Sequence, residues 1–427
     1  MNVPRLTTLG LILGLTLPAS AEDWGRFRGP NGTGISEAKS IPTQFEDSSY
    51  LWKTEIPGTG NSSPVSAKGK VFLQSSSPDQ THRSLSCVDL ATGTIDWTKD
   101  VPGGKVKIHA KNSAASSTPA TDGERIYAIF WDGTAVALHA FDFAGKALWM
   151  APLGAFASQH GVGMSPIVVD DMVIVNFDMD ERATVLAFET KTGKEVYRIP
   201  RTAYRASYST PFLTEGKGGR ELIVASTAGV SGYEPKTGKE LWTWTWKFAG
   251  APLRMVSSPI AHNGMIFATT GDGGGDRDMV GIRDRGQGDV TKANLVWEIA
   301  SDKKDKAKVG SRAATAYVPT MLAKGDHLYW VTDIGLATCV EAKTGKLMWS
   351  ERLGSSGVSA SPIMIDGKIL ALTEDGTAYF FKADPAKYSL VGKSKLGEAT
   401  FASPAVADGK LLIRTKTQLL CIGSKPQ

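Results

Sequence analysis

The 427-residue sequence has few of the features that mark common enzyme active sites. It contains three cysteines and six histidines, and no two cysteines form a CxxC or an adjacent pair. It also has no Gly-x-Ser-x-Gly elbow, no His-Glu-x-x-His motif and no Walker loop. The motifs of thiol-redox enzymes, zinc peptidases, serine hydrolases and nucleotide hydrolases are therefore absent, whereas hydrolysis by scattered carboxylates stays open.

Long apolar runs are also missing after the N-terminus, where no uninterrupted stretch reaches the roughly 20 residues that a membrane helix needs. Apolar residues make up 41% of the chain, and the formal net charge of +5 is mild for this length. The four lysines between Asp302 and Lys308 have no interleaved aromatic residues, which is typical of a solvated linker. We therefore expect a soluble all-β protein with no nucleic-acid partner.

The N-terminus has the features of a secretory signal peptide. Met1 to Arg5 is cationic, Leu6 to Leu17 is apolar, and Ala19-Ser20-Ala21 is a small-residue cleavage site. The apolar stretch is too short for a membrane anchor, and no cysteine follows the cleavage site to carry a lipid. We predict that residues 1–21 are removed, which leaves a periplasmic or secreted protein without a membrane span.

A dipeptide that is mostly Ser-Pro or Thr-Pro recurs eight times, at intervals of roughly 42 to 60 residues that are typical of propeller blades. The eight dipeptides are Ser63-Pro64, Thr118-Pro119, Ser165-Pro166, Thr210-Pro211, Ser258-Pro259, Val318-Pro319, Ser361-Pro362 and Ser403-Pro404. Each is followed by a β-run.

Five intervals carry a second marker, which is an acidic residue, a glycine turn and then an aromatic residue four positions after the glycine. The series is Asp89-Gly93-Trp97, Asp142-Gly145-Trp149, Glu189-Gly193-Tyr197, Glu234-Gly238-Trp242 and Glu341-Gly345-Trp349. The glycine accepts positive φ, so the pattern predicts a hairpin turn between two strands. The aromatic ring then lies on the outgoing strand, where we expect it to pack against the neighbouring blade.

The third interval resolves into four short strands, at 166–169, 172–177, 184–188 and 195–199. A β-helix or a sandwich does not need four strands per period, so we predict an eight-bladed β-propeller with four-stranded antiparallel blades. The eighth interval supplies only three strands, whereas an additional strand at 50–56 precedes the first Ser-Pro. We expect this strand to close the last blade. The predicted domains are an N-terminal strap at 22–49 and the propeller at 50–423.

The three cysteines occupy matching places, each on the predicted third strand of its blade. Other blades have Ala140, Ala187 or Gly232 there, so the position asks for a small buried residue. Equivalent atoms of different blades are too far apart for disulfide geometry. We therefore expect free buried thiols at Cys87, Cys339 and Cys421.

The repeat of Ser-Pro strand, apolar strand and Asp/Glu-x-x-Thr-Gly-Lys-x-x-Trp resembles the pyrroloquinoline-quinone-like (PQQ-like) repeat. That repeat occurs in quinoprotein dehydrogenases and in the propeller of the outer-membrane assembly lipoprotein. The segments Trp24-Gly25-Arg26-Phe27-Arg28-Gly29-Pro30 and Arg285-Gly286-Gln287-Gly288-Asp289 are similar to those of secreted propellers of planctomycete-type bacteria. Likeness to the dehydrogenases would imply an adjacent cysteine pair, a Ca²⁺ site and a catalytic Asp, but this chain is shorter and has no Cys-Cys.

The connection into each blade leads to its innermost strand, so residues shortly before each Ser-Pro are expected around one mouth of the central channel. Cationic donors that converge in a low-dielectric funnel suit carboxylate or phosphate ligands, whereas solvated loop charges or inter-blade ion pairs are the alternative. No catalytic residue is predicted. The predicted ligand-binding residues are His109, Lys111, His160, Tyr204, Arg205, Arg254 and Arg312, with Gln159 beside them.

One long irregular insertion is predicted at 271–289. Its aspartates could offer oxygen ligands to Ca²⁺, but the spacing departs from an EF-hand and a structural loop is the alternative. The sequence thus favours a non-catalytic, monomeric binding or scaffold protein for a cell-envelope protein, peptide or small anionic ligand, with no cofactor expected. The alternative is a PQQ-dependent oxidoreductase that holds the anionic quinone and Ca²⁺ in the funnel.

Overall fold

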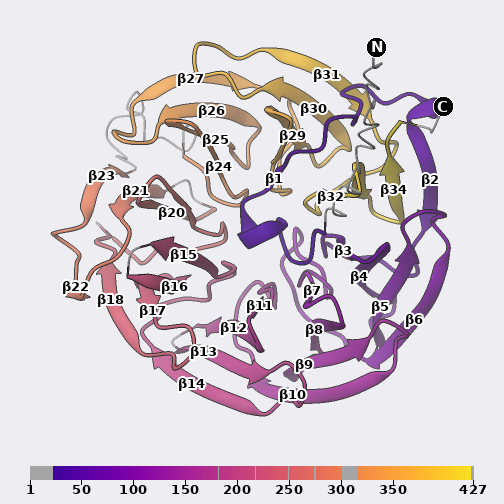
Figure 1. Cartoon of the computed structure of the whole chain (residues 1–427), viewed down its shortest axis with the longest axis horizontal. Coiled ribbons are helices and arrows are strands. Elements are labelled where there is room, and N and C mark those ends of the chain that lie inside the picture. Colours follow the sequence, from indigo (N-terminus) through magenta and orange to yellow (C-terminus); the bar gives the residue numbers. More distant parts are fainter. Residues whose placement is uncertain are drawn as a thin grey trace, which may run out of the picture.

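The computed structural model describes residues 23–424, except 181, 217, 249, 274–275 and 301–314. The described chain forms eight antiparallel blades around a central axis (Figure 1), which confirms the predicted propeller. No helix in the described part of the chain is long and apolar enough to cross a membrane. The predicted signal peptide at 1–21 lies outside the described residues.

In each blade the strands run from the axis outward. Blade 1 comprises β3 (Val65–Ala67), β4 (Lys70–Ser76), β5 (His82–Asp89) and β6 (Ile95–Pro102); blade 2 comprises β7 (Ala120–Thr121), β8 (Arg125–Trp131), β9 (Ala135–Asp142) and β10 (Ala147–Ala155). Blade 3 comprises β11 (Ile167–Val169), β12 (Met172–Met179), β13 (Arg182–Glu189) and β14 (Glu195–Arg201); blade 4 comprises β15 (Phe212–Gly216), β16 (Gly219–Ala225), β17 (Gly229–Tyr233) and β18 (Glu240–Thr245).

Blade 5 comprises β19 (Ile260–His262), β20 (Met265–Gly271), β21 (Arg277–Arg283) and β23 (Leu295–Ala300); blade 6 comprises β24 (Leu322–Lys324), β25 (His327–Val331), β26 (Leu336–Glu341) and β27 (Leu347–Arg352). Blade 7 comprises β28 (Ile363–Ile365), β29 (Lys368–Leu372), β30 (Thr377–Lys382) and β31 (Leu390–Lys395); blade 8 comprises β32 (Ala405–Ala407), β33 (Lys410–Arg414), β34 (Gln418–Ile422) and β2 (Tyr50–Glu55). Outside these sheets lie the short 3-10 helices η1 (Pro30–Gly32) and η2 (Asp47–Ser49).

The ring closes as predicted, because the N-terminal strand β2 pairs antiparallel with β34 and becomes the outer strand of blade 8. The closure is reinforced near the axis by Arg414 at the end of β33. Its buried guanidinium donates to the carbonyl oxygens of Ser62 and Gln74 and to Ser75 Oγ, all in or next to blade 1. The first and last blades are therefore joined at both the outer and the inner edge.

Neighbouring blades interlock through the predicted aromatic residues. Five rings cover the glycine turn of the next blade: Trp52, Trp97, Trp149, Tyr197 and Trp297. A Cβ added to Gly145, for example, would lie 2.8 Å from the ring of Trp97. A β-bulge precedes Trp97 on β6, and the small Cys87 lies opposite Trp97 on β5. The ring's polar atom donates to a backbone carbonyl of the next blade at six interfaces: Trp52 to Leu90, Trp97 to Phe143, Trp149 to Thr190, Tyr197 to Pro235, Trp297 to Ala342 and Trp349 to Asp384.

Trp242 belongs to one buried cluster with Ile266 and Ile282 of blade 5, but its hydrogen bond differs from those of the other rings. Its indole nitrogen donates to Glu221 Oε2 within blade 4 over 2.8 Å, and Glu221 also pairs with Arg285 at 3.0 Å. Arg285 belongs to the connection between β21 and β23, which carries β22 (Gly288–Asp289) and adds it in parallel to β18. The link between blades 4 and 5 is therefore an added strand with an ion pair, because blade 5 has no glycine turn at that place.

The sixth blade opening is also shifted relative to the prediction. Thr320, and not Val318, occupies the place of the other Ser or Thr residues, because it stands two positions before its innermost strand as Ser63 does before β3. Its backbone N–H donates to Ser361 Oγ of blade 7 in the same way as other opening residues. Pro319 is displaced by two residues from the usual proline position.

The N-terminal strap, residues 23–49 of the described chain, crosses the centre of the ring at one end of the channel, where its indigo ribbon is visible in Figure 1. Trp24 forms a β-bridge with Ser66 of blade 1, Asn31 exchanges two hydrogen bonds with Leu213 of blade 4, and β1 (Ile35–Ser36) pairs in parallel with β28 of blade 7. Arg28 is buried and donates five hydrogen bonds to carbonyl oxygens of Gly32, Thr33, Thr320, Met321 and Pro362. The strap thus connects blades on opposite sides of the axis.

The three cysteines are free and buried on third strands, as predicted. Each lies opposite the outer-strand tryptophan of its own blade: Cys87 opposite Trp97, Cys339 opposite Trp349 and Cys421 opposite Trp52. The large ring leaves room only for a small partner, which explains why alanine or glycine fills the same place elsewhere. Burial raises the pKa of all three thiols to about 12.

Candidate functional site

A funnel of about 380 Å³ follows the propeller axis. The chain enters each innermost strand at the open mouth and leaves it beside the N-terminal strap, so the connections before the strands form the mouth. Phe27 of the strap lines the other end of the funnel. The strap therefore turns a central channel into a pocket that is open on one face.

The lower tier of the funnel is a nearly uniform ring of hydroxyl groups. In each blade a Ser or Thr stands two residues before the innermost strand. In all blades but one, its side-chain oxygen accepts the backbone N–H of the matching residue in the preceding blade. Seven such links occur, at 2.8 to 3.0 Å, and only the link between blades 3 and 4 is missing from the described residues. We call these residues the hydroxyl ring: Ser63, Thr118, Ser165, Thr210, Ser258, Thr320, Ser361 and Ser403.

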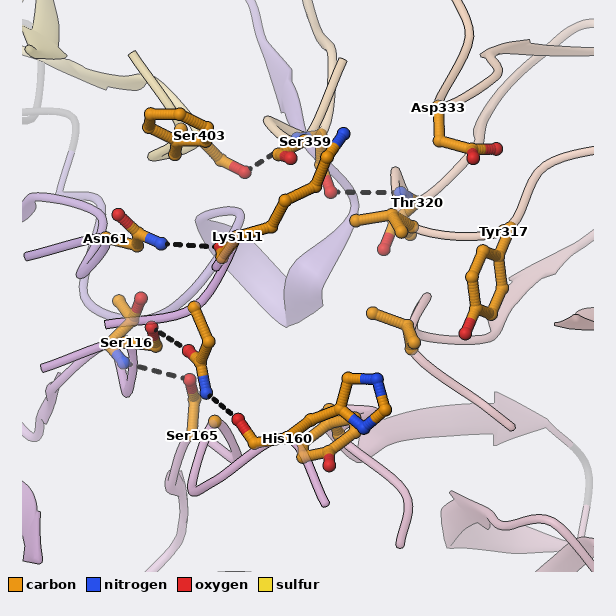
Figure 2. A pocket seen from close by; sticks show the side chains of 18 of the residues that line it. Asn61, Lys111, Ser116, His160, Ser165, Tyr317, Thr320, Asp333, Ser359 and Ser403 are labelled. Carbon is orange, nitrogen blue, oxygen red and sulfur yellow. Dashed lines mark hydrogen bonds between the residues drawn. The ribbon is translucent and has the colours of Figure 1, made fainter. Parts of the chain in front are cut away.

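A second, varied tier lies two residues earlier in every blade, and all eight of its members line the funnel. They are Asn61, Ser116, Gly163, Tyr208, Val256, Val318, Ser359 and Phe401. Blades 4 to 6 supply an apolar wall, whereas blades 7, 1 and 2 supply polar side chains. Figure 2 shows labelled members of both tiers on different sides of one open space. The lower tier has the same chemistry in every blade, whereas the varied tier differs from blade to blade.

The mouth above these tiers brings together four of the seven predicted ligand-binding residues: His109, Lys111, His160 and Arg254 line the funnel. The imidazoles of His109 and His160 stack with their centroids 4.9 Å apart. Lys111 extends from the connection into blade 2 toward blade 7, where Nζ lies 2.8 Å from Glu374 Oε1. Figure 2 shows Lys111 reaching across the open space.

Of the other three predicted residues, two are described and do not line the funnel. Tyr204 is 46% exposed. Arg205 donates to the carbonyl oxygen of Pro252 over 3.2 Å. Its positive charge contributes to the lowered pKa of His160 at the mouth. Arg312 lies outside the described residues.

Arg254 carries a positive charge that its surroundings balance poorly. It is only 7% exposed, its guanidinium donates to the neutral amide oxygen of Gln159 over 2.9 Å, and its Nε has no partner. Burial, followed by repulsion from Arg205, lowers the pKa of Arg254. The alternative of inter-blade ion pairing therefore describes Lys111 and not Arg254.

The positive charge of Arg254 also affects the pKa of His160. Burial and then the positive charge of Arg254 lower its pKa to about 4, and its buried Nδ1 has no hydrogen-bond partner. The imidazole is therefore neutral at pH 7. Among the described residues that line the funnel, Asp333 is the only carboxylate, and it pairs with Arg277 at 3.0 Å. Arg254 and Arg205 supply positive charge at the mouth, and the negative charge of Asp180 offsets it in part.

The insertion predicted at 271–289, with Ca²⁺ binding and a structural loop as the alternatives, is shorter and more regular than predicted. Residues 277–283 form strand β21, and the connection from β20 spans only 272–276. Arg277 donates to the carbonyl oxygen of Asp272 over 2.6 Å and pairs with Asp333, so the loop is held by an arginine. No group of three or more His, Cys, Asp or Glu side chains in the described chain is placed to hold a metal ion.

The quinone cofactor implied by the repeat can be tested against these residues. The three thiols lie on third strands and none lines the funnel, and the described lining offers only the paired Asp333 as a carboxylate. The described residues therefore do not fit a Ca²⁺-bound quinone held against a cysteine pair.

Sequence reasoning missed the varied tier and the closure of the funnel by Phe27. The varied tier had a signal, because its members stand at a fixed offset of two residues before each hydroxyl. Their chemical diversity hid that register, since only aligned repeats show that Gly163 and Phe401 are equivalent. The position of the N-terminal strap had no such signal, because it depends on contacts between residues more than 180 positions apart, such as Asn31 and Leu213.

The eight blades, their Ser-Pro openings and their aromatic interlocks define a PQQ-like repeat β-propeller. The chain belongs to the family of the outer membrane protein assembly factor BamB, whose model matches residues 42–161, 138–313 and 289–423. BamB from Shewanella oneidensis is 26% identical over 195 residues, which cover 45% of this chain and 46% of the relative. BamB from Salmonella typhimurium is 22% identical over 205 residues, which cover 46% of each. The chain thus spans about half the length of these curated relatives.

A shorter match is to a tetrathionate hydrolase from Acidithiobacillus ferrooxidans, 30% identical over 30% of this chain and 28% of that protein. Among solved structures, a quinohemoprotein alcohol dehydrogenase from Comamonas testosteroni has a TM-score of 0.69 at 13% identity, covering 95% of this chain and 81% of its own. BamB from Moraxella catarrhalis has a TM-score of 0.58 at 14% identity, covering 88% and 99%. At these identities the structural likeness shows the fold alone.

Proposed function

We propose that this protein is a non-catalytic binding protein of the cell envelope that takes an anionic group of its ligand or partner into the central funnel. The observation that carries the proposal is the buried guanidinium of Arg254 at the mouth, which has a neutral hydrogen-bond partner and the like charge of Arg205 nearby. A buried cation is costly unless a partner balances it. An anionic ligand supplies that balance.

The neighbouring side chains support an anion as well. Lys111 is half exposed, and its ammonium can leave Glu374 to meet a ligand because exposed ion pairs are weak. His160 is neutral without a ligand, and an adjacent anion would favour its protonated form. Three groups from the connections into blades 2, 3 and 5 can therefore respond to one negative charge.

The relatives agree with an envelope role. The family takes its description from an outer membrane protein assembly factor, which supports a cell-envelope protein or peptide as partner and a periplasmic or secreted location. The name of the tetrathionate hydrolase states that this relative acts on a sulfur oxyanion. Under this proposal the N-terminal strap closes the funnel and the propeller presents its open mouth to the partner.

The test is calorimetric titration of residues 22–427 with organic di- and tricarboxylates, phosphate and sulfate at low ionic strength. Arg254→Gln should weaken binding at least tenfold, because a hydrogen-bonded charge pair is lost. Arg198→Gln is the matched control, since Arg198 lies on the outer strand β14 and pairs with Glu195. Added salt should weaken binding through screening over about 8 to 10 Å.

Equal binding by the parent and Arg254→Gln would contradict this assignment of the site. Pyrroloquinoline quinone, which carries three carboxylates, belongs among the probes, with and without Ca²⁺. Dye-linked oxidation of alcohols or sugars in its presence would contradict the non-catalytic part of the proposal.

A further inference from the structure

The hydroxyl ring has a directional hydrogen-bonding arrangement. Each linked hydroxyl oxygen accepts a backbone N–H from the preceding blade, as Thr118 Oγ1 does from Ser63 and Ser165 Oγ does from Thr118, both at 3.0 Å. None of these hydroxyls donates to another group of the described chain. A hydroxyl carries one proton and two lone pairs, so the proton of each remains available. Each linked hydroxyl therefore accepts one hydrogen bond from the protein and still has an O–H to donate to a ligand.

These donors converge on the closed end of the funnel. Seven of the eight ring residues line it, and Thr118, Ser165, Thr210, Thr320 and Ser361 are each less than 5% exposed. Figure 2 shows Ser165, Thr320 and Ser403 around the same space. Phe27 lies at that end, so a group that enters from the mouth reaches the ring before it meets the N-terminal strap. Buried donors without acceptors favour an occupant that accepts hydrogen bonds.

Positive charge lies directly behind the ring. Arg28 donates to the carbonyl oxygens of Thr320, itself a ring member, and Pro362, while Arg414 donates to that of Ser62, the neighbour of Ser63. Neither guanidinium pairs with a carboxylate in the described residues, and both are buried. Burial lowers the pKa of each to about 9, which still leaves both charged at pH 7. Two buried positive charges without carboxylate partners in the described residues therefore lie next to the ring.

We propose that the hydroxyl ring is the seat of an oxyanion group, either a small free oxyanion or the oxyanionic head of a larger ligand. The inference rests on the proposed function, in which the funnel takes an anion, and adds where the charged group lies and what holds it. Several O–H donors would bind the oxygens, and Arg28 and Arg414 would balance the charge from behind the ring. The varied tier and the mouth would then contact the rest of a larger ligand.

The charges decide between this occupant and a metal cation. Hydroxyl oxygens can also coordinate a cation through a free lone pair, but two buried guanidinium groups next to the ring repel one. A neutral polyol would use the donors and leave the guanidinium charges unbalanced. The oxyanion alone satisfies both the donors and the charge.

Thr210 provides the test, because the link between blades 3 and 4 is missing and no described N–H donates to Thr210 Oγ1. Thr210→Val therefore removes one donor without breaking an inter-blade hydrogen bond. Thr210→Ser keeps the hydroxyl. Thr214→Val is the matched control, since Thr214 lies on the innermost strand β15 that follows Thr210, its buried hydroxyl has no partner, and it lines a separate cavity beside Arg26 and Asn31.

Binding of phosphate, sulfate and citrate to residues 22–427 is measured by calorimetry at constant ionic strength, with melting curves for each variant. Thr210→Val should bind about tenfold more weakly, as expected for a lost hydrogen bond to a charged group, while Thr210→Ser and Thr214→Val bind like the parent. A preference for phosphate or sulfate identifies a free oxyanion, and a preference for citrate identifies the head group of an organic acid.

Unchanged anion binding by Thr210→Val would overturn the placement of the anion at the hydroxyl ring. If Arg254→Gln nevertheless weakens binding, the proposed function still stands. If Thr210→Val weakens anion binding and Arg254→Gln does not, the hydroxyl ring is supported as the anion site, and the role of Arg254 at the mouth is overturned. If none of the three anions binds the parent, both proposals fail. If Thr210→Val does not fold, the ring is judged from Ser361→Ala, which removes a donor between blades 6 and 7; normal binding by that variant would overturn the seat.

Discussion

The indole nitrogen of Trp52 donates a hydrogen bond to the carbonyl oxygen of Leu90, 3.1 Å away. The contact joins the N-terminal strand β2, which completes blade 8, to the turn of blade 1. The Trp52 ring also covers Gly93 of that turn, where an added Cβ would lie 2.6 Å from it. Trp52 therefore makes, where the ring closes, the same hydrogen bond to a backbone carbonyl that five other aromatic residues make between consecutive blades.

This contact predicts two graded losses of stability. Trp52→Ala should lower the free energy of unfolding by about 3 kcal/mol, because it removes a packed ring and its hydrogen bond. Trp52→Phe keeps the ring and should cost only about 1 kcal/mol for the lost donor. Denaturant unfolding measures both. Equal effects of the two variants would show that ring packing does not contribute to closure.

Removal of the closing strand should have a larger effect. A chain that begins at residue 57 lacks β2 and the N-terminal strap, so blade 8 has three strands and the contacts that close the ring at β2 are absent. Its thermal transition should become broad or vanish, because cooperative unfolding depends on a closed ring. A variant with the parent's melting transition would show that the eight blades do not need this closure.

The fold was predictable because its signals repeat. The turn glycine and the aromatic residue reflect a contact between neighbouring blades. In the structure five rings cover a glycine of the next blade, and six donate a hydrogen bond to a backbone carbonyl there. Trp242 packs with residues of blade 5 as predicted, but it makes no hydrogen bond to that blade, because the turn expected there is replaced by the connection that carries β22. The prediction failed at Val318, because Thr320, and not the residue before the proline, provides the inter-blade hydrogen bond.

The candidate site was predictable in part for the same reason. His109, Lys111, His160 and Arg254 meet at the mouth because they occupy similar places in successive connections. Their partners were not predictable, since Lys111 pairs with Glu374, 263 positions away, and Arg254 with Gln159. Such contacts depend on the geometry of the closed ring, which local sequence does not specify.

The buried thiols predict a clear labelling pattern. A thiol with a pKa near 12 that is packed against a tryptophan is a poor nucleophile at neutral pH. The native protein should therefore take up no maleimide at pH 7, and the denatured, unreduced protein should take up three equivalents. Mass spectrometry counts the labels. One equivalent after denaturation would reveal a disulfide.

Arg28 predicts that the N-terminal strap can be loosened selectively. Arg28→Met removes all five hydrogen bonds and leaves the buried carbonyls of Met321 and Pro362 without their donor, at a cost of about 1 to 3 kcal/mol for each unsatisfied group. Hydrogen exchange should accelerate in residues 23–36 and in β28 more than in blades 2 and 3. Arg26→Met is the control, because Arg26 donates only to Pro211. Uniform acceleration in all blades would show that the strap is not a separate unit.

Two histidines predict how stability depends on pH. Burial lowers the pKa of His139 to about 4, from an ordinary value near 6.5. The pKa of His160 is also lowered to about 4, first by burial and then by the charge of Arg254. Below pH 6.5 the unfolded chain takes up protons that the folded chain refuses, so these residues make the free energy of unfolding fall as the pH decreases from about 6.5 to 4. Urea unfolding at pH 7 and pH 5 measures the change.

The His139→Phe variant isolates this contribution, because His139 already packs between the rings of Phe130 and Phe141. The variant should lose less stability between pH 7 and pH 5 than the parent does, since phenylalanine takes up no proton in either state. A bound anion should act on His160 in the opposite direction, because it favours the protonated imidazole and raises its pKa. The affinity for sulfate, which keeps its charge over this range, should therefore increase as the pH falls toward 4, and a decrease would contradict contact between the ligand and His160.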